Sequence, residues 1–441
     1  MRLPSLTVSA LAFSLLCPVF AQAEMLDLLA TLHLADQNDP NLAAVRANAR
    51  AAQQGPIIAR SALLPRLVAN GSIEETTLKQ AAGTSDYRKT QWSAKLTQPL
   101  FDWASWYQFS ASKLQLSQAQ SDALDKTQNL LLAVSEAYFD VLRADDNLAL
   151  VQAQETALER QREQADARFK VGLIARADVI EAEAQRDGAI AQRLTAEIGL
   201  SNAREKLNAA VGQDIGTLAR LRETLPLEAP IPDDVDAWAK LAREHNPGLI
   251  AARMQSEAAL SARQAERGGY LPQVALFASH GMRDNDGGAG NPFIKNESGK
   301  SDVYGVEAQW ELFASGRTHA LVQQATDRAE AAKQSALARE HQVVTGARTG
   351  YLTVKADSAR LQARQRAQAS AQLAYEATKA GYDVGTRNIV DLLLAETNLY
   401  ATKRNYANAR YDYIINSLRL QAAAGQLSEA SVVRVNGWLE P

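Results

Sequence analysis

The sequence predicts a mixed α+β protein in which one structural unit occurs twice, each time as a short helix, a pair of strands and a long helical hairpin. Three observations lead to this prediction. Short strings of residues recur in the same order in both halves of the chain, each half contains a helix-forming stretch longer than a globular core needs, and each half contains segments in which apolar and polar residues alternate.

The recurring strings lie at corresponding places in the two halves. An Asp-Pro or Asn-Pro opens each half, a Leu-Pro precedes the strand pair, and a Val-Gly follows each long helical stretch. A repeat of this size is one half of a pseudo-symmetric object and is too long to be a solenoid unit. The matched pairs are Asp39–Leu42 with Asn246–Leu249, Leu63–Pro65 with Tyr270–Pro272, Gln98–Phe101 with Trp310–Phe313, Ala137–Val141 with Gly350–Val354, Phe169–Gly172 with Tyr382–Gly385, and Leu207–Gln213 with Leu420–Gln426.

The first residues, 1–23, are predicted to be a secretory signal peptide. Arg2 supplies the positive start, Leu6 to Phe20 is apolar but too short to cross a bilayer, and Ala21-Gln22-Ala23 is a small-x-small cleavage site. The alternative is a buried N-terminal helix. Because the only cysteine, Cys17, lies in this segment, we expect a mature chain without a disulfide.

Short helices are expected at 41–64 and 248–270, and each is followed by two strand-like segments with a polar loop between them. Apolar and polar residues alternate from Tyr304 to Leu312 and from Gln91 to Thr97, which is typical of a strand with one apolar face. Strands of about ten residues with aromatic side chains on the apolar face also occur in outer-membrane barrels. The loop between the second pair is expected at Asp284–Pro292.

Four such strands cannot close a membrane barrel, because open strand edges do not persist in lipid. If the strands span a membrane, several chains must therefore share one barrel. The alternative is an ordinary soluble hairpin. No stretch of about 18 consecutive apolar residues follows Ala23, so no transmembrane helix is expected.

The segment from Ala104 to Val171 contains neither Gly nor Pro and is rich in good helix formers. As one helix it would extend roughly 100 Å, at about 1.5 Å per residue. The second half repeats this segment from Arg317 to about Ala380. Two apolar stripes predict neighbouring helices on both sides, although a single dimeric coiled coil is the alternative. The stripes are Leu131, Val134, Tyr138, Val141 and Leu148 in one, and Leu130, Ala133 and Ala137 in the other.

A break at Val171-Gly172 or Val384-Gly385 follows each long helix, and a further helical stretch ends near Gly212 or Gly425. Each half therefore contains a helical hairpin whose tip is the Val-Gly turn. Between the halves, Leu225 to Pro232 carries three prolines and is predicted to be a linker. The predicted domains are the signal peptide 1–23, a first repeat 24–224, a Pro-rich linker region 225–245, a second repeat 246–426 and a C-terminal tail 427–441.

The composition argues against an enzyme and against a nucleic-acid-binding protein. The net charge is −3, and the charged residues, 22% of the chain, are well mixed. The five histidines show no metal-ligand spacing, and the sequence has no nucleophile elbow, phosphate-binding loop or Cys-x-x-Cys. We therefore expect no catalytic residues, no bound metal and no cofactor.

Taken together, the signal peptide, the duplicated strand pair with its long hairpin and the cysteine-free mature chain resemble the TolC family of outer-membrane efflux and type I secretion channel proteins. The resemblance covers essentially the whole mature chain. Its most specific strings are Arg168-Phe-Lys-Val-Gly-Leu173 at the first tip, Gly381 to Leu392 at the second tip, and Asn408 to Tyr413 after it.

The resemblance implies a homotrimer in the outer membrane of a Gram-negative bacterium. Each chain would give four strands to a 12-stranded barrel in outer-membrane lipid and two hairpins to an α-helical tube in the periplasm. The trimer would dock onto a periplasmic adaptor (membrane fusion) protein and an inner-membrane transporter. It would be the exit duct of a tripartite efflux pump or a type I secretion system, opened by untwisting of the periplasmic hairpins.

The resemblance also implies roles for residues at the tips. Asp391 would ring the periplasmic constriction, where three copies attract cations and repel anions. Arg387 and Tyr382 would latch the inner hairpin to an acidic partner, Asp178, on the neighbouring hairpin. The alternative for both aspartates is a helix N-cap or a solvated charge. The expected adaptor contacts are Val171, Gly172, Leu173, Val384, Gly385 and Thr386.

One position departs from the family pattern. Some members carry a second aspartate one turn after Asp391, where this chain has Leu394. The constriction would then have one acidic ring backed by an apolar one, with weaker block by cations. The sequence leaves open whether the substrate is a drug or a secreted protein, and a secreted or envelope coiled-coil scaffold without a pore is the alternative function.

Overall fold

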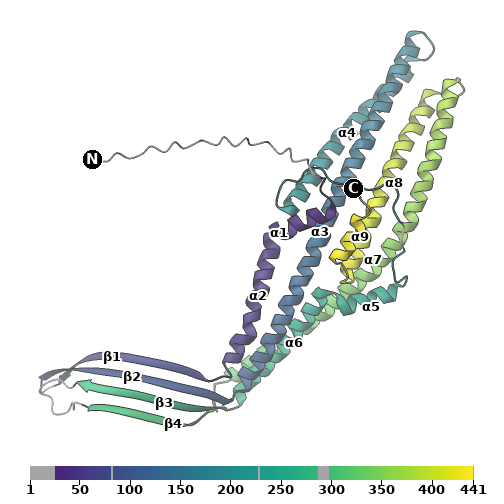
Figure 1. Ribbon diagram of the computed structural model, residues 1–441. Coiled ribbons are helices and arrows are strands. Elements are labelled where there is room, and N and C mark those ends of the chain that lie inside the picture. Colours follow the sequence, from purple (N-terminus) through teal and green to yellow (C-terminus); the bar gives the residue numbers. More distant parts are fainter. Residues whose placement is uncertain (1–24, 81–82, 227–228, 287–296, 441) are drawn as a thin grey trace, which may run out of the picture.

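The computed structural model describes residues 25–80, 83–226, 229–286 and 297–440. The predicted signal peptide, residues 1–23, lies outside the described residues. A four-stranded sheet forms one end of the molecule, and two long helical hairpins extend to the opposite end (Figure 1).

The sheet is antiparallel with strand order β1-β2-β3-β4. The strands are β1 (Arg66–Gln80), β2 (Gly83–Phe101), β3 (Gln273–Asp286) and β4 (Glu297–Gln309). They are longer than the ten or so residues that the sequence suggested. Asp284 to Asp286, expected in a loop, belong to β3, and the rest of that predicted loop lies outside the described residues. The alternation noted up to Leu312 continues past the end of β4.

The two faces of the sheet differ in chemistry. The register places Leu67, Leu96, Ala278 and Tyr304 in one row across all four strands, and most of the exposed large apolar side chains of the sheet share this face. The opposite face carries Lys95, whose Nζ lies 3.7 Å from Glu307 Oε2 and 5.1 Å from the centroid of the Phe277 ring. A sheet with one apolar and one polar face fits lipid on one side and water on the other.

Each half contributes the same set of helices. The first half has α2 (Pro40–Ser61), α3 (Trp103–Lys170) and α4 (Arg176–Val211), and the second has α6 (Pro247–Arg267), α7 (Arg317–Asp383) and α8 (Ile389–Ala423). The recurring Asp-Pro and Asn-Pro begin equivalent helices, because the side chains of Asp39 and Asn246 accept hydrogen bonds from backbone N–H groups of the first turn. A single 3₁₀ turn, η1 (Gly268–Tyr270), follows α6.

The helices form a curved row. Near the sheet the packing order is α2, α3, α6, α7, and toward the tips it is α4, α3, α8, α7. The long helices α3 and α7 run through both parts. Among the helices that the structure describes, none combines the length and apolar character that a bilayer crossing requires.

Three short helices lie beside the row at mid-height: α1 (Leu28–Asn38), α5 (Val235–His245) and α9 (Glu429–Asn436). The C-terminal segment pairs with the chain just before the linker, since the Arg222 N–H donates to Trp438 O at 3.0 Å and the Glu440 N–H to Arg220 O at 2.7 Å. The main core lies here.

The α3 side chains in this core differ in part from the predicted stripes. Val134, Tyr138 and Val141 are buried as expected, but the second stripe stays half-exposed or exposed. Ser135, Phe139 and Leu142 form the second buried line instead.

Candidate functional site at the hairpin tips

The two tips share one backbone geometry. Gly172 and Gly385 follow α3 and α7 in the left-handed region, with φ of 78° and 79°. The Leu173 N–H donates to Arg168 O at 3.0 Å, and the Thr386 N–H donates to Gly381 O at 2.8 Å. A Cβ at either glycine would meet nothing within 4 Å, so the positive φ alone requires glycine.

The predicted adaptor-contact residues form the outermost surface of the tips. Val171, Leu173 and Val384 are each at least 70% exposed, which leaves three large apolar side chains at the end of the molecule. The Thr386 hydroxyl donates to Gly381 O at 3.0 Å and so closes the second turn. Exposed apolar groups at matched tips are typical of a surface that binds another protein.

Asp178 and Asp391 occupy equivalent positions in the first turns of α4 and α8. The Asp178 carboxylate accepts a hydrogen bond from the Ala175 N–H at 3.1 Å. Ala175 is the N-cap of α4 and Asp178 is the third helical residue, so Asp178 is not the N-cap that the alternative named. In the second copy Asn388 is the cap and accepts from the Asp391 N–H at 2.7 Å. The Asp391 carboxylate is therefore not the cap, and its Oδ2 lies 3.8 Å from Arg387 Nη1.

Within one chain, the described ion pair of Arg387 is thus with Asp391 on its own hairpin and not with Asp178. The close approach of the helix backbone positions this side chain, because a Cβ at Gly381 would lie 2.8 Å from Arg387 Cγ. Leu394 follows Asp391 by one turn and is 61% exposed. Asp391 and Leu394 therefore both reach the surface of α8.

Tyr382 is 4% exposed and packs in an apolar cluster between the two hairpins. The Arg168 guanidinium lies over its ring, 4.5 Å from the centroid. Its hydroxyl has no hydrogen bond of normal geometry among the described residues. Burial raises the pKa of Tyr382, and Arg168 opposes this effect while Asp178 adds to it. Asp178 therefore acts on this hydroxyl electrostatically, without bonding to it.

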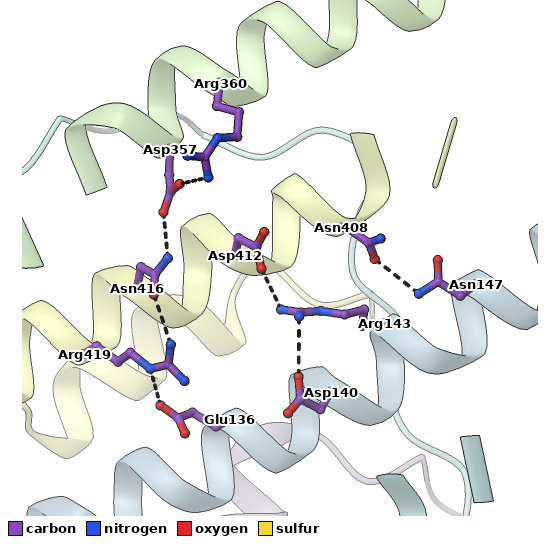
Figure 2. A network of polar contacts seen from close by, with 10 residues as sticks. All are labelled: Glu136, Asp140, Arg143, Asn147, Asp357, Arg360, Asn408, Asp412, Asn416 and Arg419. Atoms are coloured by element: carbon purple, nitrogen blue, oxygen red, sulfur yellow. Dashed lines mark hydrogen bonds and ion pairs between the residues drawn. The ribbon is translucent and has the colours of Figure 1, made fainter. Parts of the chain in front are cut away.

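Between the sheet and the tips, polar contacts join α3 to α8 along the length of the two helices (Figure 2). The Arg419 Nε donates to Glu136 Oε1 at 2.6 Å, and Arg143 Nη2 lies 3.0 Å from Asp412 Oδ1. Nearer the tips, the Asn147 amide donates to Asn408 at 3.2 Å. This ladder, defined by these three pairs, holds the two hairpins together.

The ladder extends to α7 through a buried carboxylate. Asp357 of α7 accepts hydrogen bonds from Asn416 and from Arg360, both at 2.7 Å. This group could not be predicted from the sequence, because neither its burial nor its partner on α8 follows from local spacing.

A four-stranded sheet with one apolar face, continued by two long helical hairpins with matched tips, is the fold of outer-membrane channel subunits. The solved outer membrane protein VceC of Vibrio cholerae has this fold, with a TM-score of 0.77, 21% identity, and coverage of 90% of this chain and 96% of that one. The chain belongs to the outer membrane efflux protein family, whose model matches residues 31–213 and 238–426.

Two curated relatives are similar over almost their full length. The outer membrane protein TolC of Vibrio cholerae is 36% identical over 100% of this chain and 99% of its own length. The alkaline protease secretion protein AprF of Pseudomonas aeruginosa is 30% identical over 92% of this chain and 86% of its own length. The family predicted from the sequence is therefore confirmed, and the outer membrane is the location of the protein.

Proposed function

We propose that the chain is one subunit of an outer-membrane exit duct, which conducts substrates passively from a tripartite efflux pump or a type I secretion system to the outside of a Gram-negative cell. The observation that carries the proposal is the pair of matched tips at the end of a chain that is similar over its whole length to TolC and AprF. Nothing in this duct requires chemistry on the substrate. The similarity favours a duct over a scaffold without a pore.

The working assembly is a homotrimer. Within the chain β1 pairs with β2 and β4 with β3, so both edge strands have a free side to offer to another chain. Three copies would supply 12 strands, which is enough to close a barrel in lipid. The helical tube would then lie in the periplasm.

The ends of the helix row support the same assembly. In the chain, α8 of the second hairpin packs on α3 of the first. The equivalent contact in the pseudo-symmetric ring is α4 of one subunit on α7 of the next. Both helices leave large apolar side chains exposed, as this contact requires: Ile180, Leu194 and Ile198 on α4, and Leu352 and Leu373 on α7.

The gate is the ring of second tips. Three Asp391 carboxylates would face the axis at the constriction, backed by three Leu394 side chains. Arg387 and Tyr382 would bind Asp178 of the neighbouring hairpin in the closed state, replacing the Arg387–Asp391 contact within the chain. The exposed Val171, Leu173 and Val384 and the turn residues Gly172, Gly385 and Thr386 would contact the periplasmic adaptor, beyond which lies an inner-membrane transporter.

Conductance of the purified mature protein in a planar lipid bilayer tests the proposal. We expect small, cation-selective steps for the wild type and larger steps for Arg387→Ser, because the latch is lost. Arg366→Ser, at an exposed position on α7 farther from the tip, is the matched control and should leave the steps unchanged. Failure of an assembled sample to insert would refute the duct, and identical steps in Arg387→Ser and the wild type would refute the latch.

A further inference from the structure

Glu396 is a carboxyl group buried in the contact between the two hairpins. It lies on α8 and is 2% exposed, and its Oε2 has no hydrogen-bond partner among the described residues. Leu393, one turn before it, packs in the cluster that contains Leu158 of α3, and the Tyr400 hydroxyl, one turn after it, donates to Ala153 O at 3.2 Å. Glu396 therefore lies on the part of α8 that packs between the hairpins, one turn from the hydrogen bond between Tyr400 and Ala153 of α3.

This position is one where an apolar side chain is expected. The buried residues of α8 around it, Leu392, Leu393 and Leu399, form the apolar stripe of the hairpin contact. Glu183 holds the equivalent place in the first copy and is exposed. The carboxyl group is buried because α8 packs on α3 within the chain, so its burial depends on this contact.

Among the residues that the structure describes, no ion pair offsets the burial of Glu396. The positive charge of Lys379 on α7 lowers the pKa of Glu396. The charge of Glu396 in turn raises the pKa of Tyr375 on α7 and of Tyr400 on α8. Burial raises the pKa of Glu396 from 4.5 to about 7, and Lys379 only partly opposes this.

The charged side chains of α3 near this position interact with residues other than Glu396. Arg160 acts on Tyr400. Glu155 pairs with Arg193 of α4, and Glu159 pairs with Arg186 of α4. Gln154 and Gln161 of α3 are also buried, and their carbonyl oxygens have no partner among the described residues.

We propose that Glu396 makes the contact between the hairpins sensitive to protons: the neutral carboxyl group keeps α8 packed on α3, and its ionisation favours separation of the second hairpin. The proposal rests on the proposed gating of the duct by that hairpin. The ladder nearer the sheet would hold α8 to α3 while the part beyond Tyr400 moves. The ladder would then keep one end of α8 in place, and the protonation of Glu396 would control the movement of the end of α8 near the tip.

The direction of the effect follows from linkage. A carboxyl group with a raised pKa in the packed state stabilises that state fully below its ordinary pKa, and the stabilisation is lost as the pH rises through the raised value. For Glu396 the loss extends from 4.5 to about 7. The ratio of separated to packed hairpins would rise over this range by on the order of a hundredfold and then level off.

The test is the resting conductance of the purified trimer in planar bilayers between about pH 4 and 8, a range that brackets the linkage interval. All variants carry Asp391→Asn, which removes the acidic group of the proposed constriction, so that its titration does not contribute to the pH response. We expect conductance to rise with pH in this background, and Glu396→Gln to abolish the rise and keep the low value. Glu376→Gln, an exposed charge-matched control on α7, should leave the rise unchanged.

A second variant adds a signed shift. Lys379→Met removes the positive charge that favours the carboxylate of Glu396. The pKa of Glu396 should therefore rise further, and the pH at which conductance levels off should move upward. A pH response that survives in Glu396→Gln, or no pH response in the Asp391→Asn background, would overturn the proposal. Arg387→Ser, measured at one pH, tests the gate independently of Glu396. If its conductance is larger than that of the wild type while the Glu396 test fails, the proposed duct and its latch are still supported.

Discussion

The substitution Tyr382→Phe removes one hydroxyl from the second tip and leaves the rest of the side chain in place. The ring stays in the apolar cluster between the hairpins, and the contact with the Arg168 guanidinium over its face is retained. The variant therefore isolates what the hydroxyl contributes.

The size of the effect depends on whether the hydroxyl is bonded in the closed trimer. In the single chain it has no hydrogen bond of normal geometry, and an unsatisfied buried polar group costs about 1–3 kcal/mol. If Asp178 of the neighbouring hairpin accepts from it, the bond contributes about 1.5–3 kcal/mol to the closed state. A loss of about 1.4 kcal/mol already changes the ratio of closed to open channels tenfold.

Single-channel conductance and thermal unfolding of the trimer, measured together, separate these cases. We expect Tyr382→Phe to raise resting conductance without raising the melting temperature. Tyr375→Phe is the matched control, because Tyr375 packs against the same cluster from α7 but takes no part in the latch. Unchanged conductance together with a raised melting temperature would show that the hydroxyl is unbonded in the closed channel, and the latch assignment would fail.

Two further predictions concern the constriction and the wall of the tube. Polyvalent cations should block Leu394→Asp more tightly than the wild type, because the variant adds a second acidic ring one turn from Asp391; equal block in bilayer recordings would remove these residues from the constriction. Asp357→Ala should lower the free energy of unfolding by about 2–4 kcal/mol, because it leaves Asn416 without its acceptor and Arg360 without its carboxylate. A denaturant midpoint equal to that of the wild type would contradict this value.

Features with local signals could be predicted from the sequence. The ends of α3 and α7 follow from the loss of helix formers at Val171-Gly172 and Val384-Gly385, and the turn glycines need only a positive φ. The Asp-Pro and Asn-Pro starts are equally local, since capping involves neighbouring residues. The duplication followed from such strings because they recur in order in both halves, whereas family and function followed from the resemblance of the whole mature chain to a known family.

Features that depend on contacts between distant segments could not be predicted. The burial of Glu396 and Asp357 arises where α8 packs against α3 and α7, and the charge of either residue would ordinarily suggest an exposed position. The second buried line of α3, which includes Phe139, likewise depends on which helices lie beside it. Local spacing suggested a helix N-cap at Asp178, but the N-cap is Ala175 and Asp178 is the third residue of the helix.

The two hairpin tips have nearly the same backbone conformation but different side chains. Their turns share two equivalent backbone hydrogen bonds and nearly the same positive φ, yet the side chains at matched positions diverge. Ile174 of the first tip is Arg387 in the second, Phe169 is Tyr382, and Leu173 is Thr386, so polar groups replace apolar ones within one turn of the glycine.

Polar replacements at one tip are not needed to make the turn, since the other tip forms it without them. They are costly at Tyr382, whose hydroxyl is buried without a good partner in the single chain. The Tyr382 hydroxyl destabilises the isolated hairpin and is not needed for its fold. A hydrogen bond of this hydroxyl to a neighbouring hairpin in the proposed trimer would explain its presence. The divergence of the two copies therefore supports the proposal that the second hairpin is the movable part of the gate and the first hairpin a support.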